Sequence, residues 1–104
     1  MDESLKSRIR ETIDSQKVVL FMKGSRVFPQ CGFSAKVVAI LKDLSVEFRD
    51  VNILQDADLR EGLKEYSNWP TFPQLYVDGK LVGGCDIVSE LHQAGELKDL
   101  VAKA

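Results

Sequence analysis

The sequence predicts an α/β fold in which a central four-stranded mixed sheet is flanked by helices, with one helix added at the N-terminus. Three observations support this prediction. Short apolar runs rich in β-branched residues alternate with segments of helical periodicity. An Asp78-Gly79 pair separates two further apolar runs, which is typical of a hairpin. The length of 104 residues suffices for one domain and not for two, so we expect a single domain over residues 1–104.

Each expected element follows from its own local pattern. Apolar residues three or four positions apart indicate helices, whereas short continuous apolar runs indicate buried strands. The expected helices are residues 3–15, 32–44, 57–66, one that starts with Ile87, Val88 and Leu91, and a short terminal one with Leu97, Leu100 and Val101. The expected strands are Val18 to Met22, a segment with Phe48, Val51 and Ile53, and two hairpin strands with Leu75, Val77, Leu81 and Val82. Residues 23–30, which contain glycine and proline, are expected to form a long loop.

The order of these elements determines how the strands pair. The first two strands, joined through a helix, are expected to be parallel, because a helical crossover returns the chain in the same direction. The hairpin then adds an antiparallel edge to the sheet. This arrangement is a thioredoxin-like α/β layer.

Composition and charge exclude several classes of protein. Leu, Ile, Val and Phe make up 33 of the 104 residues, which excludes a disordered chain. Fourteen basic and 16 acidic residues give a net charge of −2, so the chain lacks the basic excess of a nucleic-acid binder. The longest apolar run, Val18 to Met22, is far shorter than the roughly 20 residues needed to cross a bilayer.

The N-terminal sequence and the cysteine content indicate a reducing compartment. The first six residues are mostly polar and include two acidic ones, unlike a secretory signal. Two cysteines, Cys31 and Cys85, are too few for a disulfide scaffold. We therefore expect the cytoplasm, or the stroma or matrix of an organelle reached through a transit peptide that has been removed.

Cys31 is the strongest candidate for a reactive residue. It lies where the long loop gives way to the second expected helix, and backbone amides at a helix N-terminus favour the thiolate. Lys23, at the end of the first expected strand, is well placed to add positive charge. Pro29, Gln30 and Gly32 give the sulfur no apolar pattern, so a reactive or ligating role is favoured over packing as a small buried hydrophobe.

Ser34 stands three residues after Cys31, where a dithiol motif would have its second cysteine. A hydroxyl cannot form a disulfide, so the ordinary Cys-x-x-Cys redox cycle is excluded. Two interpretations of Ser34 remain open: a plain residue of the first helical turn, or a residue with a polar role at the site. Under both interpretations, the Cys-x-x-Cys redox cycle is excluded.

The Thr71-Phe72-Pro73 segment leads into the hairpin. Proline cannot donate a hydrogen bond to a sheet, so Pro73 indicates either a strand edge or a special peptide bond. A cis Phe72–Pro73 bond would turn the Phe72 amide and carbonyl out of the sheet, where an extended peptide can pair with them. An ordinary trans bond is the commoner case, because cis bonds are only about 5–6% of X–Pro bonds.

Two further groups of residues offer positions for an anion. Arg60 and Lys64 are four residues apart and share one helix face, either as a solvated basic face or, with Lys23, around a carboxylate. The segment 83–86 (Gly-Gly-Cys-Asp) lies between the last strand and the next helix, whose first amides can hold an anion. Asp86 is alternatively the N-cap of that helix.

Taken together, these motifs resemble those of the monothiol glutaredoxins of the Cys-Gly-Phe-Ser type. The resemblance covers about residues 17–101, with the motifs in the family's order and spacing. The matching motifs are Lys23-Gly24, Pro29-Gln30-Cys31-Gly32-Phe33-Ser34, Trp69-Pro70-Thr71-Phe72-Pro73 and Gly83-Gly84-Cys85-Asp86. The resemblance implies the glutaredoxin form of the thioredoxin-like fold, a redox-active and iron-binding centre at Cys31, and a glutathione site.

The implied glutathione site joins residues from distant parts of the chain. Its expected members are Lys23, Arg60, Phe72, Pro73, Cys85 and Asp86. Lys23 and Arg60 suit the glycyl carboxylate, and main-chain groups of Phe72 suit the cysteinyl backbone. The amides of Cys85 and Asp86 suit the γ-glutamyl carboxylate, and the Asp86 side chain suits the ammonium group.

The resemblance also implies a [2Fe–2S] cluster that bridges two protomers, with a monomer when the cluster is absent. Such a cluster takes four thiolates or substitutes for them. One ligand count uses Cys31 from each chain and two bound glutathiones, and we prefer it because external ligands make the cluster easy to transfer. The other count uses Cys31 and Cys85 from both chains and no glutathione.

Three functions are therefore expected, in this order. The first is a carrier that receives and donates [2Fe–2S] clusters as a glutathione-ligated homodimer and passes them to iron–sulfur apoproteins. The second is a weak glutathione-dependent thiol–disulfide oxidoreductase that removes glutathione from protein mixed disulfides, with Cys31 as nucleophile and a second glutathione or Cys85 as the releasing thiol. The third is a regulatory adaptor, with BolA-family proteins as the partner that the resemblance suggests.

Overall fold

The computed structural model describes residues 1–102, which contain ten secondary-structure elements. The helices are α1 (Glu3–Asp14), α2 (Gly32–Asp43), α3 (Ala57–Ser67), α4 (Cys85–Gln93) and α5 (Glu96–Ala102), with a 3-10 helix, η1 (Ile53–Gln55). The strands are β1 (Val18–Met22), β2 (Arg49–Asn52), β3 (Gln74–Val77) and β4 (Lys80–Gly83). None of these helices, within residues 1–102, combines the length and apolarity that a membrane span needs.

The four strands form one mixed sheet in the order β2-β1-β3-β4. β1 is parallel to β2, whereas the β1–β3 and β3–β4 pairs are antiparallel, which confirms the predicted pairing. Phe21 of β1 is opposite Val51 on one side and Gln74 on the other. All five residues of β1 are buried, as the continuous apolar run predicts for a strand covered on both faces.

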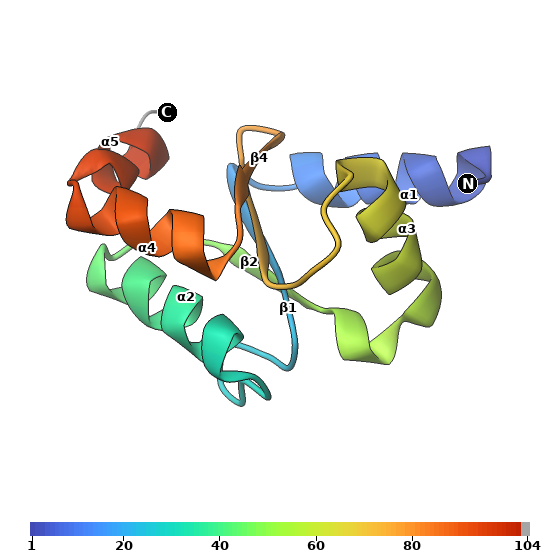
Figure 1. Ribbon diagram of the computed structural model, residues 1–104. Coiled ribbons are helices and arrows are strands. Elements are labelled where there is room, and N and C mark those ends of the chain that lie inside the picture. The colour runs from blue at the N-terminus through green and yellow to red at the C-terminus, as the bar shows by residue number, and fades with distance from the viewer. Residues whose placement is uncertain (103–104) are drawn as a thin grey trace.

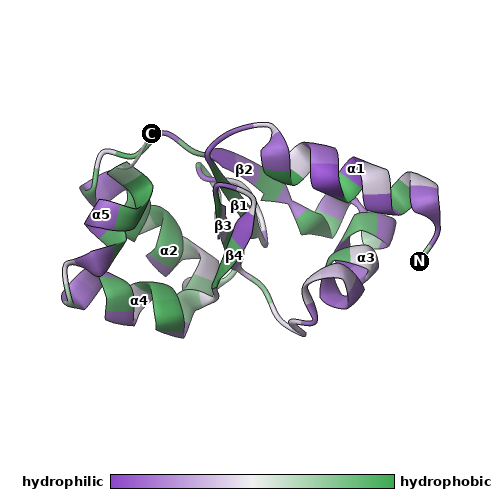
Figure 2. Ribbon diagram, turned by 90° about the horizontal axis from the view of Figure 1, so that it is seen from above, coloured by the Kyte–Doolittle hydropathy of each residue, from purple (hydrophilic) through white to green (hydrophobic). Residues whose placement is uncertain are grey.

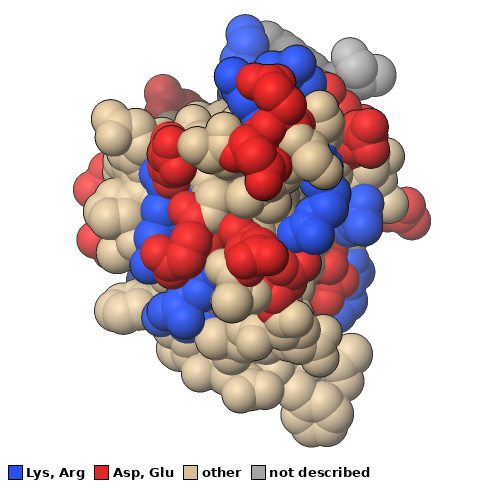
Figure 3. All heavy atoms as spheres, turned by 90° about the vertical axis from the view of Figure 1, so that its right-hand side faces the viewer, with Lys and Arg blue, Asp and Glu red and all other residues tan. Residues whose placement is uncertain are grey.

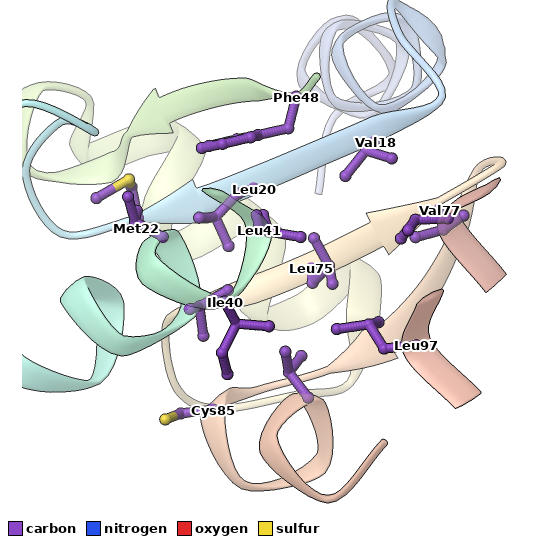
Figure 4. Packing of buried hydrophobic residues seen from close by; sticks show 14 residues of the cluster. Val18, Leu20, Met22, Ile40, Leu41, Phe48, Leu75, Val77, Cys85 and Leu97 are labelled. Atoms are coloured by element: carbon purple, nitrogen blue, oxygen red, sulfur yellow. The ribbon is translucent and has the colours of Figure 1, made fainter. Parts of the chain in front are cut away.

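Helices cover both faces of the sheet and produce the predicted thioredoxin-like arrangement (Figure 1). Seen from above, α1 and α3 lie on one side of the sheet, and α2, α4 and α5 lie on the other (Figure 2). Side chains alternate along β1, so Leu20 and Met22 pack toward the α2 side while Val19 and Phe21 pack toward the α1 side. Two buried apolar clusters result, and Figure 4 shows the one between the sheet and α2, α4 and α5.

The added N-terminal helix packs on α3. Asp2 caps α1, since its side chain accepts a hydrogen bond from the Leu5 amide at 2.7 Å. Ile9 and Ile13 are buried at the spacing of an amphipathic helix. A Cβ on Gly62 of α3 would lie 2.8 Å from Leu5 Cδ2, so the two helices approach closely at this glycine.

The second strand differs from the prediction at both of its ends. The assignment of Phe48 to this strand is wrong, because Phe48 precedes β2, which begins at Arg49. The assignment of Ile53 to the second strand is wrong: Ile53 begins η1, because the Asn52 side chain accepts a hydrogen bond from the Leu54 amide (3.0 Å) and turns the chain out of the sheet. The expected terminal helix with Leu97, Leu100 and Val101 is confirmed as α5, in which Leu97 and Val101 are buried and Leu100 is 39% exposed.

Candidate functional site

Cys31 lies at the predicted junction between the loop after β1 and the start of α2. It is the N-cap residue of α2, with extended backbone angles (φ −153°, ψ 135°) and a partly exposed side chain. The pKa of its thiol lies below the ordinary value. The backbone amide of Ser34 lowers this pKa most, partial burial opposes the effect, and the Phe33 amide, the Lys23 charge and the Ser34 hydroxyl lower it further. The structure therefore favours the thiolate.

Ser34 has a polar role at the same place. Its side chain is fully buried, and its Oγ accepts a hydrogen bond from the Lys23 backbone amide at 3.1 Å. The same hydroxyl also contributes to the lowering of the pKa of the Cys31 thiol. Of the two interpretations open from the sequence, the structure supports the polar one, because Ser34 joins the end of β1 to the start of α2.

The loop between β1 and α2 is held by side chains of β2 that no sequence motif indicates. Asn52 Oδ1 accepts a hydrogen bond from the Gly24 amide (3.0 Å), and Asp50 accepts from the Arg26 amide (2.9 Å) and from Arg26 Nε (3.0 Å). Arg26 also donates to the Phe48 carbonyl and lies over the Phe48 ring. Burial opposes ionisation of Asp50, but the hydrogen bonds and charge of Arg26 hold the pKa of this carboxyl below its ordinary value. The sequence feature that could indicate these contacts is the spacing of Asp50 and Asn52, which are two positions apart and therefore place their polar side chains on the same face of β2.

A cleft of about 430 Å³ brings together most of the predicted glutathione-binding residues. Its lining consists of Lys23, Phe33, Trp69, Thr71, Phe72, Pro73, Gly84, Cys85, Asp86 and Ile87. Five of the six residues that the resemblance implies are in this lining, and Arg60 is not. Lys23 and Phe33 form the side next to Cys31, since both act on the pKa of its thiol.

The segment from Trp69 to Pro73 forms a second wall of the cleft. The Phe72–Pro73 bond is cis, and Phe72 is buried in the cluster between the sheet and α1 and α3. Pro73 directly precedes β3, which is an interior strand. The strand-edge interpretation of this proline is therefore wrong, and the special peptide bond is the alternative that the structure contains.

The start of α4 forms the third wall. Gly84 is the N-cap residue, so the interpretation of Asp86 as N-cap is wrong, and Asp86 lies in the first turn with an exposed side chain. Cys85 is 8% exposed, with its sulfur 4.0 Å from Ser89 Oγ. It lies at the margin of the larger apolar cluster, and its sulfur points away from the labelled core residues (Figure 4). As at the start of any helix, the first amides of α4 have no acceptor within the helix.

Arg60 and Lys64 do not join Lys23 in the lining of the cleft. Lys64 Nζ lies 3.2 Å from Glu61 Oε2, in an ion pair within α3. Arg60 is half-buried, and its Nε is shielded from solvent without a hydrogen-bond partner. The part of Arg60 in glutathione binding stays a prediction.

Apolar side chains are exposed in the loop before Cys31 and in the first turn of α2. Val27 is 71% exposed, Phe28 75% and Phe33 63%. The loop before α2 lies at the lower end of the molecule in Figure 1. On the face that carries α1 and α3, which Figure 3 shows, the lower end has no charged side chains. Acidic and basic side chains are interspersed over the rest of that face. Three exposed apolar side chains therefore lie within four residues of Cys31 along the chain.

Comparisons with known proteins agree with these observations. The family model for glutaredoxin matches residues 18–82. Monothiol glutaredoxin-S14 of Arabidopsis thaliana, a chloroplastic protein, is 61% identical over 100 residues, which cover 96% of this chain and 58% of that protein. A probable monothiol glutaredoxin 2 of Rickettsia conorii is 62% identical over 93 residues, which cover 89% of this chain and 87% of that protein. The chain thus spans little more than half of the plant relative and most of the bacterial one.

Solved structures show the same architecture. Reduced apo GrxS14 of poplar is 59% identical with a TM-score of 0.80, covering 91% of this chain and 87% of that one. The holo form of glutaredoxin C1 from Populus tremula x tremuloides is 31% identical (TM-score 0.84, 96% of both chains). A buckwheat glutaredoxin–glutathione complex is 25% identical (TM-score 0.82, 97% and 93%). With a family model that matches most of its length and relatives above 60% identity, this chain belongs to the glutaredoxin family, among its monothiol members.

Proposed function

We propose that this protein binds glutathione in the cleft beside Cys31 and carries a [2Fe–2S] cluster shared between two copies of the chain. The observation that supports this most is the setting of the thiol. Cys31 is partly exposed and has a lowered pKa. It does not itself line the cleft, but Lys23 and Phe33, which both lower the pKa of its thiol, line it together with the start of α4. Ser34 occupies the place of a second motif cysteine, so the thiolate has no disulfide partner there. Such a thiolate is a ligand for iron as well as a nucleophile.

Glutathione carries two carboxylates, one ammonium group and an extended peptide body, and the cleft offers a group for each. Lys23 supplies a cation for the glycyl carboxylate, and Phe72 supplies main-chain groups for the cysteinyl backbone. The amides of Cys85 and Asp86 offer donors to the γ-glutamyl carboxylate, and the exposed Asp86 side chain offers a carboxylate to the ammonium. Arg60, outside the lining, is a second cation for the glycyl end. The buckwheat complex supports glutathione as the ligand class.

The number of accessible thiols favours a cluster completed by glutathione. The chain has two cysteines, of which Cys85 is buried with its sulfur near Ser89. Within residues 1–102, no group of three or more His, Cys, Asp or Glu side chains is placed to hold a metal ion. Since a [2Fe–2S] cluster takes four thiolates, two Cys31 thiolates and two glutathione thiolates make up the set. The cluster is then cargo, because half of its ligands are held by non-covalent contacts.

The substitution Cys31→Ser tests this proposal. After reconstitution with iron, sulfide and glutathione, the variant should lack the visible absorption of the cluster, because it has no exposed thiol at the start of α2. Cys85→Ser is the matched control, since it removes the other thiol and should retain the absorption. Wild-type-like visible absorption in the Cys31→Ser variant would contradict the assignment.

The lowered pKa of Cys31 also favours a second function, the removal of glutathione from protein mixed disulfides. The Cys31 thiolate attacks the glutathione sulfur, the protein thiolate leaves, and Cys31 becomes a mixed disulfide with glutathione. A second glutathione thiolate then attacks that glutathione sulfur, which releases glutathione disulfide and restores the Cys31 thiolate. Fast turnover by a colourless monomer would make this the main activity, whereas slow turnover with full cluster loading supports the carrier.

Partners and location follow from the same proposal. Iron–sulfur apoproteins and BolA-family proteins are the partners expected of a carrier, and the exposed Val27, Phe28 and Phe33 offer them an apolar surface beside the thiol. Relatives include a chloroplastic and a bacterial protein, which is compatible with the cytoplasm or an organelle stroma. Both the partners and the location stay predictions.

A further inference from the structure

We propose that Gln74 is a positioning residue, which fixes the Trp69–Pro73 wall of the cleft by donating both hydrogens of its side-chain amide to backbone carbonyls of that wall. The proposal deepens the proposed function, because it concerns the cleft that we assign to glutathione. The contacts that support it do not depend on glutathione. Neither Gln74 nor its partner Tyr76 belongs to the motifs that indicate the site.

The contacts of Gln74 use its whole donor capacity. Gln74 is the first residue of β3, and its side chain is fully buried. Its Nε2 lies 3.1 Å from the Trp69 carbonyl oxygen and 3.3 Å from the Thr71 carbonyl oxygen. An amide nitrogen carries two hydrogens, so both are engaged. Because unpaired buried polar groups are costly, the wall and the amide hold each other in place.

Tyr76 sets the orientation of that amide. Its hydroxyl donates a hydrogen bond to Gln74 Oε1 at 3.0 Å, and its ring makes an edge contact with Phe21, with centroids 5.5 Å apart. A flipped amide would place its oxygen against two carbonyl oxygens, so the observed orientation is the one that satisfies all three contacts. Burial raises the pKa of Tyr76 to about 12, so the hydroxyl stays protonated and remains a donor near neutral pH.

Hydrogen bonds from both flanking elements, α3 and β3, hold the Trp69–Pro73 wall. Ser67, at the end of α3, accepts a hydrogen bond from the Trp69 amide (3.1 Å) and donates to the Leu63 carbonyl (2.7 Å). Gln74 holds the other side of the turn from β3. Four of the five wall residues line the cleft, so the position of this lining relative to the sheet depends on the Gln74 contacts.

Gln74→Met tests the proposal, because methionine has a similar length and donates no hydrogen bond. Trp69 is the sole tryptophan of the chain, so its fluorescence reports directly on the wall. We expect acrylamide to quench Trp69 about twofold more strongly in the variant and glutathione to bind about tenfold more weakly, because a loose wall has to be ordered on binding. The pH midpoint of Cys31 alkylation should not move, since the groups that lower the pKa of Cys31 lie outside the wall.

Val101→Ala is the matched control for a loss of stability alone. It removes buried apolar atoms from α5, on the opposite face of the sheet, and should leave Trp69 quenching and glutathione affinity at their wild-type values. Wild-type quenching and affinity in a folded Gln74→Met variant would overturn the proposal. An equal rise in quenching for Val101→Ala would also overturn it, because the effect would then follow stability and not the amide.

Tyr76→Phe keeps the inference testable if the methionine variant does not fold. It removes the orienting hydroxyl and keeps both amide donors, so we expect a smaller but measurable rise in Trp69 quenching, and no rise would overturn the proposal. The quenching measurement needs no glutathione. If the wild type itself does not bind glutathione, the proposed function fails, while quenching still decides the role of Gln74.

Discussion

Replacing Ser34 with alanine removes one oxygen atom that serves two neighbours. The hydroxyl is fully buried, accepts a hydrogen bond from the Lys23 amide at 3.1 Å, and helps to lower the pKa of Cys31. We expect the Ser34→Ala variant to be less stable and its Cys31 thiol to be less acidic. The two effects come from separate contacts and are measured separately.

The loss of stability follows from the Lys23 amide. Alanine leaves this partly buried N–H without its acceptor, and an unsatisfied donor of this kind costs about 1–3 kcal/mol. In a domain of this size, each 1 kcal/mol corresponds to ~4–8 °C in melting temperature. A loss of ~2 kcal/mol should therefore lower Tm by roughly 8–16 °C.

The change in acidity has a definite sign. The Ser34 hydroxyl favours the thiolate, so its removal raises the pKa of Cys31 toward its ordinary value, while the backbone amide of residue 34, the largest cause of the lowering, is retained. Alkylation by iodoacetamide reports on the thiolate, and Cys85 is buried, so the rate measures Cys31. The midpoint of the pH–rate curve should move to higher pH.

Ser7→Ala provides the control, because Ser7 is exposed on α1. It should change neither the free energy of unfolding in urea nor the alkylation midpoint. If Ser34→Ala matches the wild type in both measurements, the hydroxyl does not join β1 to α2 as we describe. A fall in stability with an unchanged alkylation midpoint would mean that the Ser34 hydroxyl acts on the Lys23 amide and not on the acidity of Cys31.

Two further predictions concern charged residues. Lys23→Ala should raise the glutathione dissociation constant by about tenfold, and by more at low salt than at high salt. Arg60→Ala should raise this constant less, because Arg60 is outside the lining of the cleft. A calorimetric titration of Lys23→Ala identical to that of the wild type would make Lys23 a solvated surface residue. Asp50→Asn should cost about 1–2 kcal/mol at neutral pH. Since the pKa of Asp50 is lowered by folding, the ionised form stabilises the protein above its unfolded pKa, and this advantage over asparagine should disappear as the pH falls through the folded pKa. Urea unfolding at neutral and acid pH measures the difference in free energy of unfolding between the wild type and Asp50→Asn. Glu61→Gln, at an exposed position, is the control, and its difference from the wild type should stay near zero. A difference for Asp50→Asn that persists in acid would contradict the assignment.

Most of the fold was predictable because each element carries its own local signal. The run from 18 to 22 specifies a strand covered on both faces, and Asp78 and Gly79 tolerate the positive φ (53° and 80°) that their turn requires. The end of β2 lacks such a signal. Ile53 is buried in η1, as it would be in a strand, so hydrophobicity does not distinguish them, and the Asn52 side chain decides.

The site was predictable where it depends on contiguous motifs, and less so where it depends on contacts across the fold. The positions of Cys31 and Cys85 at helix starts follow from local sequence. Asp50 holds a backbone amide 24 positions away, and no local pattern indicates that partner. Arg60 has a suitable charge on a helix face, but the four-residue spacing to Lys64 contains no information about the distance to the cleft.

The central claim is that glutathione completes a cluster shared by two copies of the chain, and the omission of glutathione tests it most directly. Wild type and Cys85→Ser would be reconstituted with iron and sulfide, with and without glutathione, and followed by visible absorption and size-exclusion chromatography. Both proteins should assemble the cluster as dimers with glutathione, fail to do so without any small thiol, and return to monomers when a chelator removes the iron. If Cys85→Ser loses the cluster while the wild type assembles it without glutathione, the dimer binds iron through its own four cysteines, and the claim is contradicted.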